Sequence, residues 1–146
     1  MTSTIEINDS KNGILSVELQ DLLNEIGAKG ETLNWALFYL YATGDLGDDK
    51  SMGDFEDEIS DSKNGLLISW EELKSLSLKF DQIYDTLIVG NLDKEAIKKC
   101  DNDEELYSKF DVVLDLFDGA YWRVHSKYKG ILKRMLGKFT DTKVLD

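Results

Sequence analysis

Histidine and cysteine, the residue types most often found in catalytic and metal sites, each occur once in this sequence, as His125 and Cys100. A hydrolytic triad or a zinc site needs partners at a recognised spacing, and the sequence supplies none for either residue. A reactive thiolate also needs a nearby base or cationic pocket, whereas the charged neighbours of Cys100 are typical of a solvated helix end. We therefore expect a structural or exposed His125, a non-catalytic Cys100, no cofactor and no enzymatic activity.

The sequence Asp-Ser-Lys-Asn-Gly occurs twice, at residues 9–13 and 61–65, and suggests a calcium-binding loop. With the glycine at loop position six, the first ligand position holds Asn8 in one copy and Ser60 in the other. The last position, which an EF-hand fills with glutamate, holds Leu19 in the first copy and Glu71 in the second. Because an EF-hand needs clustered carboxylates, we predict that both copies are turns before capped helices and that the chain binds no metal.

Carboxylates are concentrated between residues 45 and 61, where Lys50 is the one basic residue. The whole chain carries a net charge of −12. Such a charge repels nucleic acid and anionic membrane surfaces and attracts basic proteins, although an acidic surface also simply keeps a protein soluble. We predict that a basic protein partner binds this segment. The candidate binding residues are Asp45, Asp48, Asp49, Asp54, Glu56, Asp57, Glu58 and Asp61.

The composition is that of one folded domain. The chain has 146 residues, of which 42% are hydrophobic, and it contains no proline and no linker-like stretch. This is enough apolar material for a single core, so we predict one domain over residues 1–146. The N-terminus lacks the charged and apolar regions of a signal peptide, and no apolar run reaches the length of a membrane span. A cytoplasmic location is therefore expected.

In the first half of the chain, apolar spacing predicts two strands and two helices. Residues 4–7 alternate as a strand does, and Ser16 is expected to cap a helix through residue 25. Residues 33–42 are apolar on both faces, which fits a central strand or a buried helix of similar length. Phe55 and Ile59 lie four residues apart, so a short helix over residues 51–60 would attach the acidic segment to the core.

Ser69 and Glu72 form a capping-box motif at the start of the next element. Apolar residues then recur in steps of three and four as far as Ile88, before Gly90 and Asn91. This pattern predicts a single long helix from Trp70 to the Gly-Asn pair.

The last third of the sequence changes period. After a polar helix over residues 93–99 and a further turn over 103–110, residues 112–117 form a buried strand pattern. Asp118 and Gly119 are a strong hairpin signal, so residues 120–125 return as an antiparallel strand. A helix over 127–138, capped by Ser126, and an edge strand over 142–145 complete an α+β fold, an antiparallel sheet with helices packed against it. The three tryptophans lie in apolar patterns typical of the core: Trp35, Trp70 and Trp122.

Spaced packing and turn motifs occur along most of the chain: Trp35, residues 43–47, 55–59, Gly65, 69–73, 81–85, 117–122 and 126–127. Together they resemble those of small bacterial immunity proteins of polymorphic and contact-dependent toxin systems. The resemblance implies a cytosolic protein that binds one cognate toxin domain, often a nuclease, and blocks its active site. No catalytic residue is carried over by it.

Three functional hypotheses follow from the sequence. The leading one is an immunity-type inhibitor whose acidic segment meets a basic toxin surface, where carboxylates mimic a phosphate backbone and accelerate association. The second is a regulatory or structural subunit that binds a protein unrelated to toxins. The third is a small enzyme with an unfamiliar site around His125 and neighbouring acids.

Overall fold

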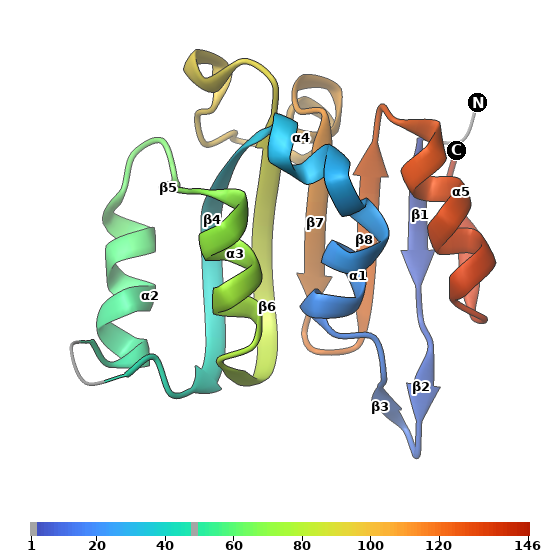
Figure 1. Cartoon of the computed structure of the whole chain (residues 1–146), viewed down its shortest axis with the longest axis horizontal. Helices are drawn as coiled ribbons and strands as arrows, with labels where there is room; N and C mark the ends of the chain where they lie inside the picture. The colour runs from blue at the N-terminus through green and yellow to red at the C-terminus, as the bar shows by residue number, and fades with distance from the viewer. Residues whose placement is uncertain (1–2, 48–49) are drawn as a thin grey trace.

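The computed structural model describes residues 3–47 and 50–146, so the predicted site residues Asp48 and Asp49 lie outside the described part of the chain. Within that part, seven strands form one antiparallel sheet in the order β5-β4-β6-β7-β8-β1-β9 (Figure 1), and helices pack against it, as the sequence predicts. The strands of this sheet are β1 (Thr4–Ile7), β4 (Asn34–Gly44), β5 (Leu66–Ile68), β6 (Phe80–Asn91), β7 (Val112–Phe117), β8 (Tyr121–Ser126) and β9 (Thr142–Val144). The helices are α1 (Leu19–Ile26), α2 (Met52–Asp61), α3 (Trp70–Ser77), α4 (Asp103–Lys109) and α5 (Lys129–Lys138).

The first helix begins later than the sequence predicts. Strand β1 has its predicted bounds, but Ser16 lies beside a small hairpin, β2 (Ser10–Lys11) with β3 (Ile14–Leu15), and its N–H donates to the Asp9 carbonyl at 2.9 Å. Helix α1 starts at Leu19, where the Asp21 carboxylate accepts the Glu18 N–H at 2.8 Å. The prediction that Ser16 caps this helix was wrong. Glu18 is the N-cap residue, and together with Asp21 it forms a capping box that satisfies the free N–H groups at the start of the helix.

Residues 33–42 form a strand rather than a buried helix. Strand β4 pairs with β5 at its first residues and with β6 along its length. Trp35 and Leu37 face the larger core, whereas Ala36 and Phe38 face a smaller core on the opposite side of the sheet. The apolar character of both faces therefore reflects burial on both sides of a central strand.

The predicted long helix after Ser69 is the main error of the sequence prediction. The capping box is confirmed, with the Glu72 N–H donating to Ser69 Oγ at 3.1 Å, but helix α3 ends at Ser77. The chain then turns and continues as β6, which lies between β4 and β7 in the sheet. Aromatic and β-branched residues, which favour strands, are frequent in this stretch. Hydrogen bonding to a strand on each side therefore stabilises an extended backbone, although the apolar spacing is that of a helix.

The C-terminal half follows the predicted order with shorter helices. The polar helix predicted over residues 93–99 is reduced to a 3-10 turn, η2 (Lys94–Ala96), which Asp93 caps. The hairpin at Asp118 is confirmed. Helix α5 begins two residues later than predicted, because Ser126 belongs to β8 and its Oγ accepts the Tyr128 N–H at 2.9 Å.

Two apolar clusters lie on opposite faces of the sheet. The larger one packs α1, α3 and α5 on one face (Figure 1) and contains all three tryptophans, whose predicted core positions are confirmed. The smaller one lies on the other face, where Leu106 and Phe110 from the α4 segment and Ile97 cover one end of the strands. In the described ranges, no helix is long and apolar enough to cross a membrane.

Candidate protein-binding surface

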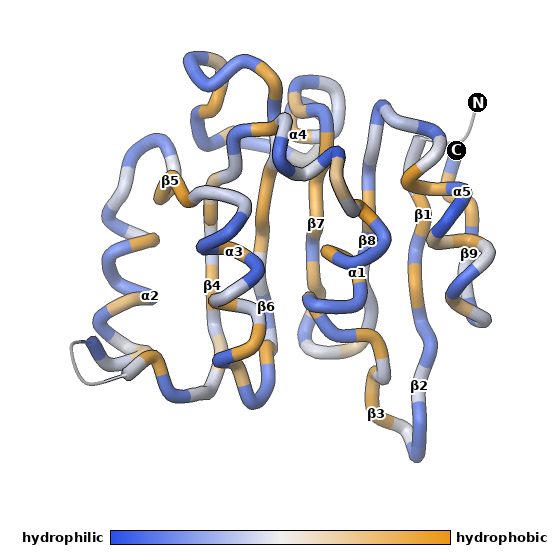
Figure 2. Tube along the Cα trace, viewed as in Figure 1, coloured by the Kyte–Doolittle hydropathy of each residue, from blue (hydrophilic) through white to orange (hydrophobic). Residues whose placement is uncertain are grey.

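Helix α2 carries most of the described candidate acids and lies along an edge of the sheet (Figure 1). Strand β5 pairs with residues 35–37 of β4, and α2 packs against β4 beyond that point. The N-cap is Ser51, whose Oγ accepts the Asp54 N–H at 3.1 Å, and Phe55 and Ile59 anchor the helix in the larger core. The helix predicted over residues 51–60 is thus confirmed, and Figure 2 shows a mostly hydrophilic helix with isolated hydrophobic residues.

The outward face of α2 is an acidic stripe. Its members are Asp54, Asp57, Glu58 and Asp61, which are all exposed and are spaced by three or four residues, so they share one side of the helix. Glu58 forms a salt bridge with Lys50. Among the described residues, no cation lies within ion-pair distance of the other three carboxylates. The stripe therefore presents uncompensated negative charge to the solvent.

Glu56, by contrast, has a structural partner. Its side chain is half-buried and turns toward the sheet, where the carboxylate accepts the Ala42 N–H at 2.8 Å. Unpaired backbone N–H groups on a strand edge can pair with another chain and lead to aggregation. The Glu56 carboxylate satisfies one such group, the Ala42 N–H on the edge of β4. No sequence signal predicts this contact, because Glu56 differs from its acidic neighbours only in the direction that its side chain faces.

Asp45 lies apart from the stripe, in the loop after β4. Its Oδ1 accepts the Gly47 N–H at 2.9 Å, a local turn contact, and its side chain is exposed. The structure therefore brings four of the eight predicted residues together on α2, assigns Glu56 to the β4 edge, and places Asp45 on a neighbouring loop.

An open, aromatic part of the sheet lies on β4, the strand against which α2 packs. Beyond the area covered by the smaller core, Tyr39 and Tyr41 of β4 are 47% and 52% exposed. The ring of Tyr84, on the adjacent strand β6, lies 5.1 Å from that of Tyr41. Further across the same face, the rings of Phe117 and Tyr121 stack at 5.0 Å.

This face was missed by the sequence prediction, although one signal for it exists. Tyr39, Tyr41 and Thr43 alternate with Leu40 and Ala42, which is typical of a strand with one solvated side. The sequence prediction treated both faces of residues 33–42 as apolar and buried. It therefore missed that one face of β4 is covered at its start and exposed to solvent at Tyr39 and Tyr41.

His125 and Cys100 occupy different environments. His125 is buried; its Nδ1 lies 3.2 Å from Thr4 Oγ1 and its ring stacks on Tyr107. Desolvation lowers the pKa of this imidazole. Cys100 is half-buried, and burial raises the pKa of its thiol, which favours the protonated form.

The two Asp-Ser-Lys-Asn-Gly copies have different structures. In the first, Asn12 and Gly13 adopt positive φ angles in the β2–β3 hairpin, and the Asp9 carboxylate accepts the Asp141 N–H at 2.7 Å. In the second, Asp61 is the last residue of α2. Over residues 3–47 and 50–146, no three His, Cys, Asp or Glu side chains are grouped so as to hold a metal ion.

No family model, curated protein or solved structure matches this chain. The resemblance to immunity proteins therefore stays a prediction that rests on sequence motifs.

Proposed function

We propose that this protein is an immunity-type binding protein that acts in the cytoplasm and neutralises a cognate bacterial toxin domain through its acidic surface. The observation that carries the proposal is the stripe of exposed, largely unpaired carboxylates on α2, which packs against β4, the strand that carries the exposed Tyr39 and Tyr41. A toxin nuclease must itself bind phosphate and so presents a basic surface. Its active-site face is the kind of partner that such a stripe would attract.

The two neighbouring features would have different roles in binding. Tyrosine is enriched in the cores of interfaces, where a rigid ring buries a large area, so Tyr39 and Tyr41 would contribute mainly to the lifetime of the complex. Charges at the rim act mainly on the association rate, which electrostatic steering can raise toward about 10⁸ M⁻¹s⁻¹ at low salt. The acidic stripe would therefore guide the partner onto the tyrosines.

The proposal implies that the gene directly upstream encodes the toxin domain, so the test uses that upstream gene product, purified as an inactive variant. Reversal of three unpaired carboxylates, Asp54, Asp57 and Asp61, to lysine changes the net charge from −12 to −6. The matched control reverses three exposed glutamates outside α2 and changes the net charge by the same amount. These are Glu31, Glu95 and Glu104.

The stripe variant should associate about tenfold more slowly at low salt, with a weaker salt dependence, whereas the control should change the rate by about twofold. The double substitution Tyr39→Ala with Tyr41→Ala should instead raise the dissociation rate by about five- to thirtyfold, as loss of one or two kcal/mol implies. Stopped-flow rates at two salt concentrations measure both effects. Equal rates for the stripe and control variants, or no binding to the upstream gene product, would overturn the proposal.

A further inference from the structure

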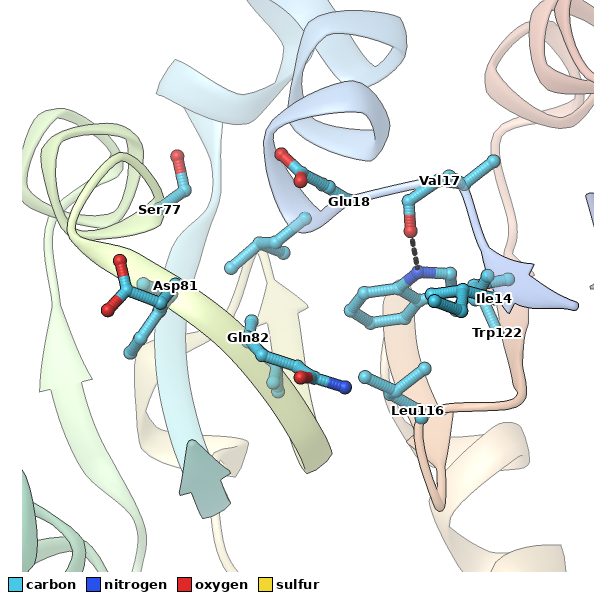
Figure 3. Close-up of a pocket in the computed structure, with 13 residues that line it drawn as sticks. Ile14, Val17, Glu18, Ser77, Asp81, Gln82, Leu116 and Trp122 are labelled. Carbon is cyan, nitrogen blue, oxygen red and sulfur yellow. Dashed lines mark hydrogen bonds between the residues drawn. The ribbon is translucent and has the colours of Figure 1, made fainter. Parts of the chain in front are cut away.

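A cleft opens on the helix-covered side of the sheet, where the start of α1 and the β2–β3 hairpin face the end of α3 and the start of β6 (Figure 3). Its volume is about 200 Å³. Leu116 and Trp122 form a buried apolar wall, and Ile14, which is 66% exposed, lies on the rim. The Trp122 indole is held in place because its Nε1–H donates to the Val17 carbonyl at 2.8 Å (Figure 3).

The size of the cleft limits its occupant to one small group. An engineered apolar cavity of about 150 Å³ holds a benzene molecule, whereas pockets for drug-sized ligands measure about 300 to 1,000 Å³. The cleft is therefore suited to a group of the size of a single side chain. Phe80 and Ile83 line the cleft as well as Trp122, and this apolar lining favours a hydrocarbon stem.

The charged groups at the cleft are of one sign. Glu18 and Asp81 both line it (Figure 3), and none of the described lining residues is basic. The positive end of α1 is already offset by its own Asp21, which caps the Glu18 N–H. Asp81 is exposed and has no ion-pair partner among the described residues. A cation at the mouth of the cleft would therefore meet an uncompensated carboxylate.

We propose that this cleft binds an organic cation with an apolar stem, whose ammonium or guanidinium end lies by Asp81 and whose stem packs against Trp122. The site is separate from the acidic stripe, since no residue of α2 lines it. The cation is either a free amine or a lysine or arginine side chain of a polypeptide. The inference does not depend on the proposed toxin partner, so the two can fail independently.

The test is an NMR titration of the full chain with three probes that share one stem: n-butylammonium, n-butanol and n-butyrate. The Trp122 indole N–H and the Leu116 methyl groups report on occupancy. Butylammonium should bind about two- to fivefold more tightly than butanol, as one exposed charge pair allows, and butyrate more weakly than either. Three equal affinities, or shifts confined to α2, would overturn the proposal.

Asp81→Asn should lower the preference of the cleft for butylammonium over butanol, to the level that Glu18 alone supports. The matched control Asp101→Asn removes an exposed carboxylate outside the cleft and should leave the preference intact. If both substitutions act alike, the selectivity comes from net charge and the site assignment is wrong. The tripeptide acetyl-Ala-Lys-Ala-amide then distinguishes the sources: shifts at the same resonances indicate a polypeptide side chain, and shifts with butylammonium alone indicate a free amine.

Discussion

Glu56 is the carboxylate of α2 whose removal should destabilise the fold. Truncation by Glu56→Ala leaves the Ala42 N–H on the β4 edge without its acceptor at 2.8 Å. A hydrogen bond to a charged group contributes about 1.5–3 kcal/mol when it is well sheltered. Because the Glu56 side chain is only half-buried, water replaces part of this interaction. We therefore expect the free energy of unfolding to fall by about 1–2 kcal/mol.

The neighbouring Asp57 supplies the control. It is exposed, and the structure gives its side chain no ion-pair or hydrogen-bond partner in the described chain, so Asp57→Ala should change stability by within about 0.5 kcal/mol. Glu56→Gln keeps an acceptor oxygen without the charge, so it should restore about half of the loss. The three variants thus separate the effect of the hydrogen bond from that of charge on α2.

Urea unfolding followed by circular dichroism measures these differences directly. The midpoint should shift for Glu56→Ala while the slope of the unfolding free energy against urea stays constant, since the native fold is retained. A destabilisation of Glu56→Ala no greater than that of Asp57→Ala would refute the edge contact. If the contact is confirmed, charge-reversal experiments on this surface must leave Glu56 in place.

Gly90 should not tolerate a methyl group: a Cβ there would lie 2.8 Å from the Trp35 ring, so Gly90→Ala should cost about 1–3 kcal/mol. Gly137→Ala in α5, where no atom lies within 4 Å, should instead stabilise by up to about 1 kcal/mol, and thermal unfolding of both variants decides the sign of each effect. Burial lowers the pKa of His125 from its ordinary value of 6.5, so the unfolded state binds more protons as the pH falls through that value. Stability should therefore decrease as the pH falls through 6.5 toward the lower pKa of the folded state, and His125→Gln should flatten this dependence; an unchanged slope would contradict the burial of the imidazole.

Local signals in the sequence determined several elements of this protein. The Ser69 capping box and the Asp118 hairpin turn were both predicted correctly, because their geometry depends on residues within three positions of one another. The antiparallel α+β class followed from these elements and from the alternation of residues 112–117. The net charge and the acidic composition of α2 are likewise properties of the sequence alone.

Tertiary structure decided what local spacing left ambiguous. The stretch from Phe80 to Asn91 has apolar residues at helical steps, yet it is extended because β4 and β7 pair with it on both sides. The same pairing exposes Tyr39 and Tyr41 on an open face and turns Glu56 toward a strand edge. These outcomes depend on contacts between segments tens of residues apart, and hydrogen bonding and burial across such contacts outweigh the intrinsic preferences of the residues involved.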